Sequence, residues 1–258
     1  MSALQHWAES LPLWAIPQDI IDRAPTSPWI HPVSSFTPKG DLHVDTPSRI
    51  RALEALPEGG SVLDVGCGGG RAAFGLVPPA AHVIGVDHQQ GMLDVLASEA
   101  AERGVECDTI LGDWPDVADR TPVADIVVCH HVFFNVADLG PFVRELSSHA
   151  RRRVVVELPM HHPLSGLSAM WKKFWDLDRP VSPTAHDALA VVRELGFDAH
   201  LEEFVQVTGV RPVTDEDVEF TRIRLCLMAD RDAEIRAHLE ANPVTERRLA
   251  TIRWDAHS

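Results

Sequence analysis

Short apolar runs recur through the middle of the chain and alternate with longer segments in which apolar and polar residues are mixed. The runs at residues 126–128 and 154–156 consist only of Ile and Val, without polar alternation. Continuous apolar runs are typical of parallel strands that helices cover on both faces. We therefore predict five strands, at residues 61–65, 82–86, 105–111, 125–129 and 154–158.

Helices are predicted around these strands, at about residues 46–56, 71–77, 91–103 and 139–150. The later part of the chain adds further elements, namely a helix (184–195), a sixth strand (199–207), two helices (215–228 and 233–239) and a last strand (249–254). Regular alternation of strands and helices predicts a doubly wound α/β fold with a mostly parallel sheet.

Residues 1–45 are rich in proline and tryptophan and show no sustained helical or strand period. We predict that they form an ordered N-terminal wrap. Residues 46–258 are expected to form one domain, because the length of the chain suits a single α/β domain with elaborations. The segments at about 160–183 and 211–247 depart from the alternation, and we expect them to add cap elements to the sheet.

The composition narrows the classes of partner. The 258 residues carry a net charge of -15, and nucleic-acid binding draws on a basic field, so we expect no nucleic-acid partner. The one basic run, residues 151–153, is interpreted as a solvated turn.

The four cysteines lie far apart without a C-x-x-C pair, which favours reduced thiols. Neither a leader pattern nor a membrane-length apolar run is found, so a soluble cytoplasmic protein without a membrane partner is expected.

A glycine-rich segment, Asp64 to Gly70, directly follows the first predicted strand. Such a turn between a buried strand and a helix can hold a nucleotide-like cofactor, because glycine allows positive φ and a close approach of the ligand. As a dinucleotide fingerprint G-x-G-x-x-G/A, the segment fails at its last position, which is Arg71. As acid-x-G-x-G-x-G, every position is filled.

In this second form the segment resembles the first motif of the class I S-adenosylmethionine-dependent methyltransferases. The resemblance covers roughly residues 50–210 and implies a seven-stranded sheet whose last strand is antiparallel. It also implies S-adenosylmethionine as cofactor and S-adenosylhomocysteine as product. The four matched positions stand at the carboxyl ends of successive strands, where ligands bind in open α/β sheets.

The resemblance assigns roles around this cofactor. It implies that Asp87 accepts hydrogen bonds from the ribose hydroxyls, that Met92 contacts the adenine face, and that Asp113 with Trp114 holds the adenine amino edge. A helix cap, a core side chain and a turn acid are the respective alternatives. The residues assigned to cofactor binding are Asp64, Gly66, Cys67, Gly68, Gly70, Asp87, His88, Met92, Asp113, Trp114 and His130.

Histidines are the candidate catalytic residues. His130 stands after the fourth predicted strand, where amino-methylating branches of the family begin their motif with Asn or Asp. A neutral imidazole can remove a proton from a phenol, a hydroxyl or an amine, and the chain contains no tyrosine. His131, His161 and His162 compete for this role, and a structural hydrogen bond to a backbone carbonyl is the alternative. Adjacent histidines without a nearby third ligand do not predict a metal site.

Side chains outside the sheet would recognise the acceptor. Trp171, Phe174 and Trp175 have the spacing of one helix face, and could form a lid or simply pack on the domain. Arg222 and Arg224 could bind a carboxylate or lie on a solvated face.

From these observations we expect an enzyme that moves a methyl group from S-adenosylmethionine to a small organic acceptor at oxygen or nitrogen. A protein that binds this cofactor without catalysis is an alternative that the sequence leaves open. A nicotinamide-dependent oxidoreductase is a second alternative, which Arg71 disfavours. The sequence does not indicate the oligomeric state.

Overall fold

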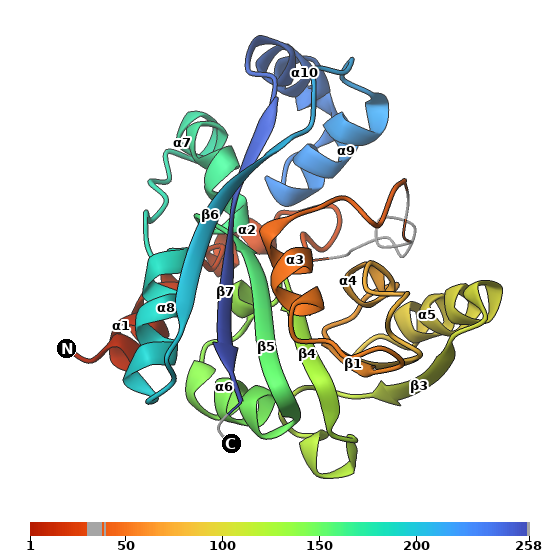
Figure 1. Cartoon of the computed structure of the whole chain (residues 1–258). Helices are drawn as coiled ribbons and strands as arrows, with labels where there is room; N and C mark the ends of the chain where they lie inside the picture. The colour runs from red at the N-terminus through yellow and green to blue at the C-terminus, as the bar shows by residue number, and fades with distance from the viewer. Residues whose placement is uncertain (30–37, 39, 257–258) are drawn as a thin grey trace.

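Seven strands form one sheet with helices on both faces in the computed structural model (Figure 1). The structure describes residues 1–29, 38 and 40–256. The strands, in sheet order, are β3 (Glu106–Leu111), β2 (His82–Asp87), β1 (Ser61–Val65), β4 (Ala124–His130), β5 (Ala150–Pro159), β7 (Glu246–Asp255) and β6 (His200–Val207). All pairings from β3 to β5 are parallel, whereas β7 is antiparallel to both of its neighbours. The predicted seven-stranded, mostly parallel sheet is thus confirmed.

Each face of the sheet carries its own hydrophobic core. On one face, α1 (Ala3–Ser10), α6 (Leu139–Ser148) and α8 (Ala185–Glu194) pack against the sheet. On the other, α3 (Pro47–Leu53), α4 (Arg71–Phe74) and α5 (Gln90–Arg103) do so. Successive strand residues point to opposite faces, so Leu63 joins the first core and Val62 the second.

A third core lies in a cap at the end of the molecule where the parallel strands finish (Figure 1). It is built from α2 (Gln18–Ile21), α7 (Ser168–Trp175), α9 (Asp215–Arg224) and α10 (Asp232–Ala241). The helix α1 was not predicted, because only tertiary packing reveals its anchor. Trp7 of α1 is fully buried, and its Nε1 donates to the carbonyl of Val136, 2.8 Å away.

Several predicted boundaries are corrected by the structure. The basic run at residues 151–153 is not a turn but part of β5, which begins four residues before the predicted position. Arg153 is stabilised there by ion pairs with Asp255 (2.6 Å) and Glu54 (3.2 Å). The helix expected to reach residue 228 stops at Arg224. Cys226 follows with a φ of 55°, which no α-helix accommodates.

Candidate active site

The glycine-rich segment forms the turn between β1 and α4. Gly66, Gly68 and Gly70 all have positive φ, at 70°, 50° and 86°. A Cβ on Gly66 would lie 2.4 Å from Cγ2 of Val132, and one on Gly70 would lie 2.2 Å from Cδ1 of Leu96. Positive φ therefore favours glycine at all three positions, and at Gly66 and Gly70 the neighbouring side chains also exclude a Cβ.

Asp87 lies at the end of β2, directly beside this turn. Its Oδ2 accepts from the Gly68 N–H at 3.0 Å, and its Oδ1 accepts from the Gln89 N–H at 2.9 Å. The second bond lies just before α5, whose N-cap is Gln89 and has no side-chain capping bond, so Asp87 is not the cap of that helix. Asp87 thus holds the backbone of the glycine turn while standing where the carboxyl ends of β1 and β2 meet.

Asp64 is the buried acid of the motif, with 1% of its surface exposed. Its Oδ2 accepts from the Ala73 N–H at 3.2 Å, so it connects β1 to α4. Burial raises the pKa of Asp64 to about 7, partly offset by the Ala73 hydrogen bond, and the charge of Asp87 raises it further. The neighbouring Cys67 is also buried, and burial raises the pKa of its thiol well above the usual value.

The remaining residues assigned to the cofactor lie in different environments. His88 and Asp113 are exposed, and Nδ1 of His88 lies 3.7 Å from Oδ1 of Asp113. Met92 is buried in the first turn of α5. The indole of Trp114 points into the core, where Nε1 donates to the Phe142 carbonyl at 3.2 Å. Its ring is therefore committed to packing, which leaves its backbone as the part that can face a ligand.

His130 and His131 occupy the carboxyl end of β4. His130 is half-buried, and its Nε2 is shielded from solvent without a hydrogen-bond partner among the described residues. Burial lowers the pKa of His130, and Glu157 opposes this effect. His131 has a φ of 62° and is half-exposed. Its backbone N–H donates to the carbonyl of Glu157 at 2.7 Å, and its Nε2 lies 3.3 Å from Oε1 of Glu157.

Glu157 is a site residue that the sequence analysis missed. It lies on β5 in register with His130, and it is buried. Burial alone would raise the pKa of its carboxyl, but His130 and hydrogen bonds from His131 and Ser48 hold it below the usual range. Ser48 also shares a 2.6 Å hydrogen bond with Thr251. The signal was present in the sequence, because Glu157 is a charged residue directly after an uninterrupted apolar run.

The two histidines after β5 take opposite positions. His161 is exposed and forms an isolated bridge with Thr184. His162 is buried, and its ring stacks on Trp14 at a centroid distance of 4.1 Å. Burial, followed by the charge of Arg179, lowers the pKa of His162 to about 4. Of the pair, His162 is the one turned inward.

The aromatic residues of α7 pack within the cap. Trp171 is fully buried in the third core, and Nε1 of Trp175 donates to the Leu225 carbonyl at 2.7 Å. Arg222 forms an ion pair with Asp232 at 2.9 Å. Arg224 is buried, so the solvated face considered for it is wrong.

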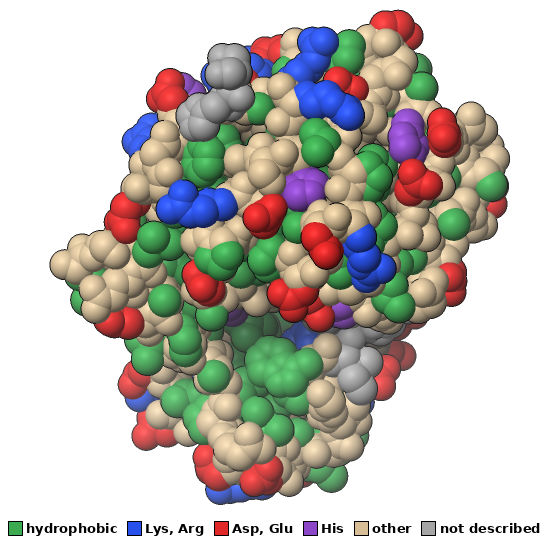
Figure 2. Space-filling view, turned by 90° about the horizontal axis from the view of Figure 1, so that it is seen from below, with side chains coloured by type: hydrophobic (Ala, Val, Ile, Leu, Met, Phe, Trp, Pro, Cys, Tyr) green, Lys and Arg blue, Asp and Glu red, His purple; other side chains and the backbone are tan. Residues whose placement is uncertain are grey.

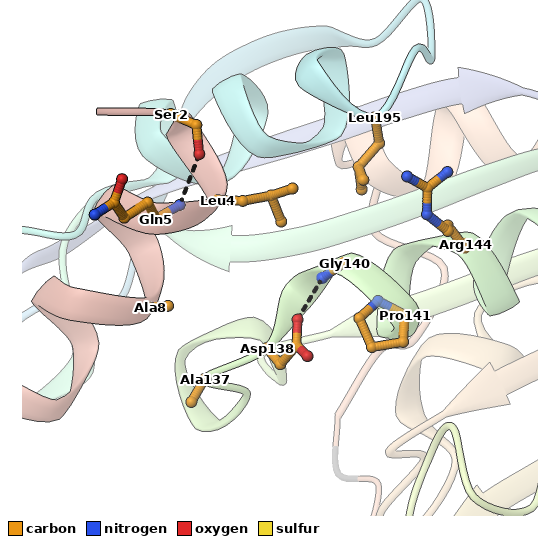
Figure 3. Close-up of a pocket in the computed structure, with 10 residues that line it drawn as sticks. All are labelled: Ser2, Leu4, Gln5, Ala8, Ala137, Asp138, Gly140, Pro141, Arg144 and Leu195. Atoms are coloured by element: carbon orange, nitrogen blue, oxygen red, sulfur yellow. Dashed lines mark hydrogen bonds between the residues drawn. The ribbon is translucent and has the colours of Figure 1, made fainter.

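Two grooves in the described structure lie away from the glycine turn. One, of about 770 Å³, lies among α1, α6 and the C-terminal end of α8, and Leu4, Arg144 and Leu195 line it (Figure 3). The other, of about 330 Å³, lies beside α7. Figure 2 shows acidic and basic side chains interspersed on one face, around a hollow where hydrophobic side chains gather.

The described residues contain neither a cluster of metal ligands nor a helix that could span a membrane. Among them, no three His, Cys, Asp or Glu side chains are grouped so that they could hold a metal ion. No helix of the described chain is long and apolar enough to cross a bilayer.

Comparison with known proteins identifies relatives of the central part of the chain. Residues 62–153 match the family model described as a methyltransferase domain. A ubiquinone biosynthesis O-methyltransferase of Azorhizobium caulinodans is 38% identical over 94 residues, which are 36% of this chain and 37% of the relative. The enzyme of the same description from Marinobacter nauticus is 31% identical over 127 residues, which are 47% of this chain and 52% of the relative. The chain thus spans about a third to a half of these curated relatives.

Among solved structures, the YcgJ protein of Bacillus subtilis superposes with a TM-score of 0.56 at 19% identity. The match covers 82% of this chain and 98% of that chain. At this level of identity the likeness concerns the fold alone.

Proposed function

We propose that this chain, whose residues 62–153 match a methyltransferase domain, belongs to the class I S-adenosylmethionine-dependent methyltransferases and transfers the methyl group of S-adenosylmethionine to a small organic acceptor at oxygen or nitrogen. The observation that carries the proposal is the glycine turn with Asp87 beside it, at the carboxyl ends of β1 and β2. Both relatives are named as O-methyltransferases, which favours oxygen as the acceptor atom.

The turn suits a cofactor with a nucleoside and charged groups. A glycine-rich turn with positive φ at three positions can present its backbone N–H groups to the charged groups of a ligand. We propose that this turn holds the cofactor and that the buried residues Asp64 and Cys67 stabilise the turn. In the same proposal the Asp87 carboxylate accepts from the ribose, and His88, Met92, Asp113 and Trp114 flank the adenine.

S-adenosylmethionine would supply an already activated methyl group, so the protein's main task is to position the two reactants. Such positioning is worth on the order of 7–11 kcal/mol. A general base would add about 10²–10⁴-fold in rate.

We propose His130 as the residue that faces the acceptor. Its Nε2 has no hydrogen-bond partner in the described part of the chain. Burial lowers the pKa of the ring, which favours the neutral imidazole that removal of an acceptor proton requires. His131 is the second candidate, because the Glu157 carboxylate would stabilise its imidazolium. His161 is the weakest of the three, because it is exposed and forms a bridge with Thr184.

Calorimetric titration with S-adenosylmethionine, S-adenosylhomocysteine and NADH tests the proposal. We expect heat of binding with both sulfur compounds and none with NADH. Binding of NADH alone would instead favour the oxidoreductase. Binding of the sulfur compounds without methyl transfer to any molecule in a screen of phenols, hydroxy acids and amines with radiolabelled donor would favour the non-catalytic alternative.

Asp87→Ala gives the residue-level test. We expect it to weaken S-adenosylhomocysteine binding at least tenfold, since a charge-assisted hydrogen bond contributes about 1.5–3 kcal/mol. Asp94→Ala is the matched control, because Asp94 is an exposed acid on the neighbouring helix α5. Equal affinities of the two variants would contradict the assignment of Asp87.

A further inference from the structure

Four side chains meet between the sheet and the cap, and we call them the Trp14–Arg179 cluster. They are Trp14, His162, Trp171 and Arg179. The guanidinium carbon of Arg179 lies 5.3 Å from the Trp14 ring centroid and 5.2 Å from that of Trp171. His162 stacks on Trp14. The cluster therefore joins the N-terminal segment, the loop after β5 and the segment after α7 into one unit.

The cluster lies beside the segment that follows β4. In open α/β sheets the ligand crevice opens where the strand order reverses, here between β1 and β4. The glycine turn and Asp87 follow β1 and β2, on one side of that point. The ring of His162 lies 5.4 Å from that of Phe134, which comes four residues after His130 at the end of β4. The cluster thus contacts the segment that directly follows the proposed catalytic histidines of β4, whereas the glycine turn follows β1.

Arg179 carries a positive charge that no described acidic side chain neutralises. Its acidic neighbours in sequence, Asp176 and Asp178, both pair with Lys172, at 2.8 and 2.9 Å. Arg179 is half-buried, and loss of solvent lowers its pKa. Its two Nη groups donate only to backbone carbonyls, those of Trp14 and Ala15. In a chain with a net charge of -15, a desolvated arginine without a carboxylate partner is unusual.

The cluster contains hydrogen-bond donors that lack acceptors. Nε of Arg179 and Nε1 of Trp171 are shielded from solvent and have no hydrogen-bond acceptor among the described residues. Nδ1 of His162 accepts from the Leu164 N–H at 3.2 Å, so its Nε2 bears the proton in the neutral ring. A buried donor without an acceptor costs about 1–3 kcal/mol. An anionic group that accepted from these donors would recover this cost.

We propose that the Trp14–Arg179 cluster binds a carboxylate of the methyl acceptor, which makes small carboxylic acids the substrate class. This inference rests on the proposed methyl transfer. A carboxylate fits better than a phosphate, because its single charge is balanced by the one guanidinium, and His162 is neutral at pH 7. The planar fork of arginine also matches the two oxygens of a carboxylate. Holding the acid at this cluster leaves the rest of the acceptor to extend toward His130 and His131.

Arg179 also holds the N-terminal segment in place through hydrogen bonds to the Trp14 and Ala15 carbonyls. The test must separate this structural role from ligand binding. Two variants do so. Arg179→Met removes charge and donors while keeping the length of the side chain. Arg179→Lys keeps the charge but loses the fork. Arg144→Met is the matched control, because Arg144 is an exposed arginine of α6 that lines the remote groove in Figure 3.

The experiment is calorimetric titration of the protein saturated with S-adenosylhomocysteine. The probes are hydroxybenzoic, hydroxycinnamic and indole carboxylic acids, each paired with its primary amide. We expect the wild type to bind at least one acid tenfold or more tightly than its amide. Arg179→Met should reduce this ratio to about one without changing the amide affinity, and Arg179→Lys should retain part of it. Arg144→Met should leave the ratio unchanged.

Three results would overturn the inference. The first is a wild type that shows no tenfold preference for any acid. The second is a preference that survives Arg179→Met. The third is an equal loss of acid and amide binding accompanied by a lower melting temperature, which would mean that Arg179 only fastens the N-terminal segment. Failure of S-adenosylhomocysteine to bind would reject the proposed function and this inference with it, whereas cofactor binding without an acid preference rejects the inference alone.

Discussion

The buried acid Asp64 should make the stability of the protein fall as the pH rises. Its pKa is about 7 in the folded protein, against 3.8 for an unperturbed aspartate. Between these two values the folded state holds a proton that the unfolded state has released. Stability is therefore lost as the pH rises through this window. The full shift corresponds to about 4 kcal/mol, and about 3 kcal/mol of this falls between pH 5 and pH 8.

Asp64→Asn removes this titration and keeps an oxygen that can accept from the Ala73 N–H. The free energy of unfolding should be measured by urea denaturation of both proteins at pH 5, 6, 7 and 8. Relative to the wild type, the variant should gain about 3 kcal/mol in stability between pH 5 and pH 8. Other titrating groups, such as His130 and His162, contribute to both proteins and cancel in the difference.

Asp198→Asn is the control, because 97% of the Asp198 side chain is exposed. Its stability difference from the wild type should not vary with pH by more than a few tenths of a kcal/mol. A difference for Asp64→Asn that stayed constant from pH 5 to pH 8 would refute the reasoning. It would mean that the buried carboxylate is already ionised at pH 5 and that the strand-to-helix connection tolerates its charge.

Three other variants probe the turn and the histidines. Gly66→Ala should cost about 1–3 kcal/mol more stability than Gly104→Ala in thermal melts, since both positions have positive φ but only the new Cβ at Gly66 would meet Val132. Equal costs would show that Val132 moves aside. His130→Ala should lower turnover of an identified acceptor by about 10²–10⁴-fold with little change in cofactor affinity. The wild-type rate should fall only below pH 6.5, because burial lowers the pKa of His130; undiminished turnover would shift the role to His131. Glu157→Gln should lower stability at pH 7, and this loss should shrink in acid as the wild-type carboxylate, whose pKa is lowered, takes up its proton. A loss that did not depend on pH would mean that Glu157 acts only through packing.

The sequence predicted those parts of the fold whose signal is local. Apolar runs located the buried strands β1 and β4 to within one residue at each end. The start of β5 was not predictable, because Arg153 pairs there with β4 and β7 and forms ion pairs with Asp255 and Glu54, about 100 residues away in sequence. The end of α9 was equally hidden, because nothing local shows that Cys226 takes a positive φ.

The candidate site likewise has parts that the sequence located and parts that only the folded chain reveals. The glycine turn and Asp87 are adjacent to predicted strand ends, so the sequence located them. The partnership of Glu157 with His131 and Ser48 depends on the register of β5 and on the packing of α3, and sequence spacing encodes neither. The Trp14–Arg179 cluster joins residues 165 positions apart. Only the folded chain shows that these side chains meet.

The position of β7 has a consequence for the order in which the chain folds during synthesis. It inserts between β5 and β6 and is the only described strand with which β6 pairs. Until residues 246–255 leave the ribosome, one edge of β5 and both edges of β6 lack backbone partners. Such unpaired edges attract other chains. We expect nascent chains that end before β7 to be the form of this protein that most needs a chaperone. Full protection of β5 amides from hydrogen exchange should arise only once β7 has been made.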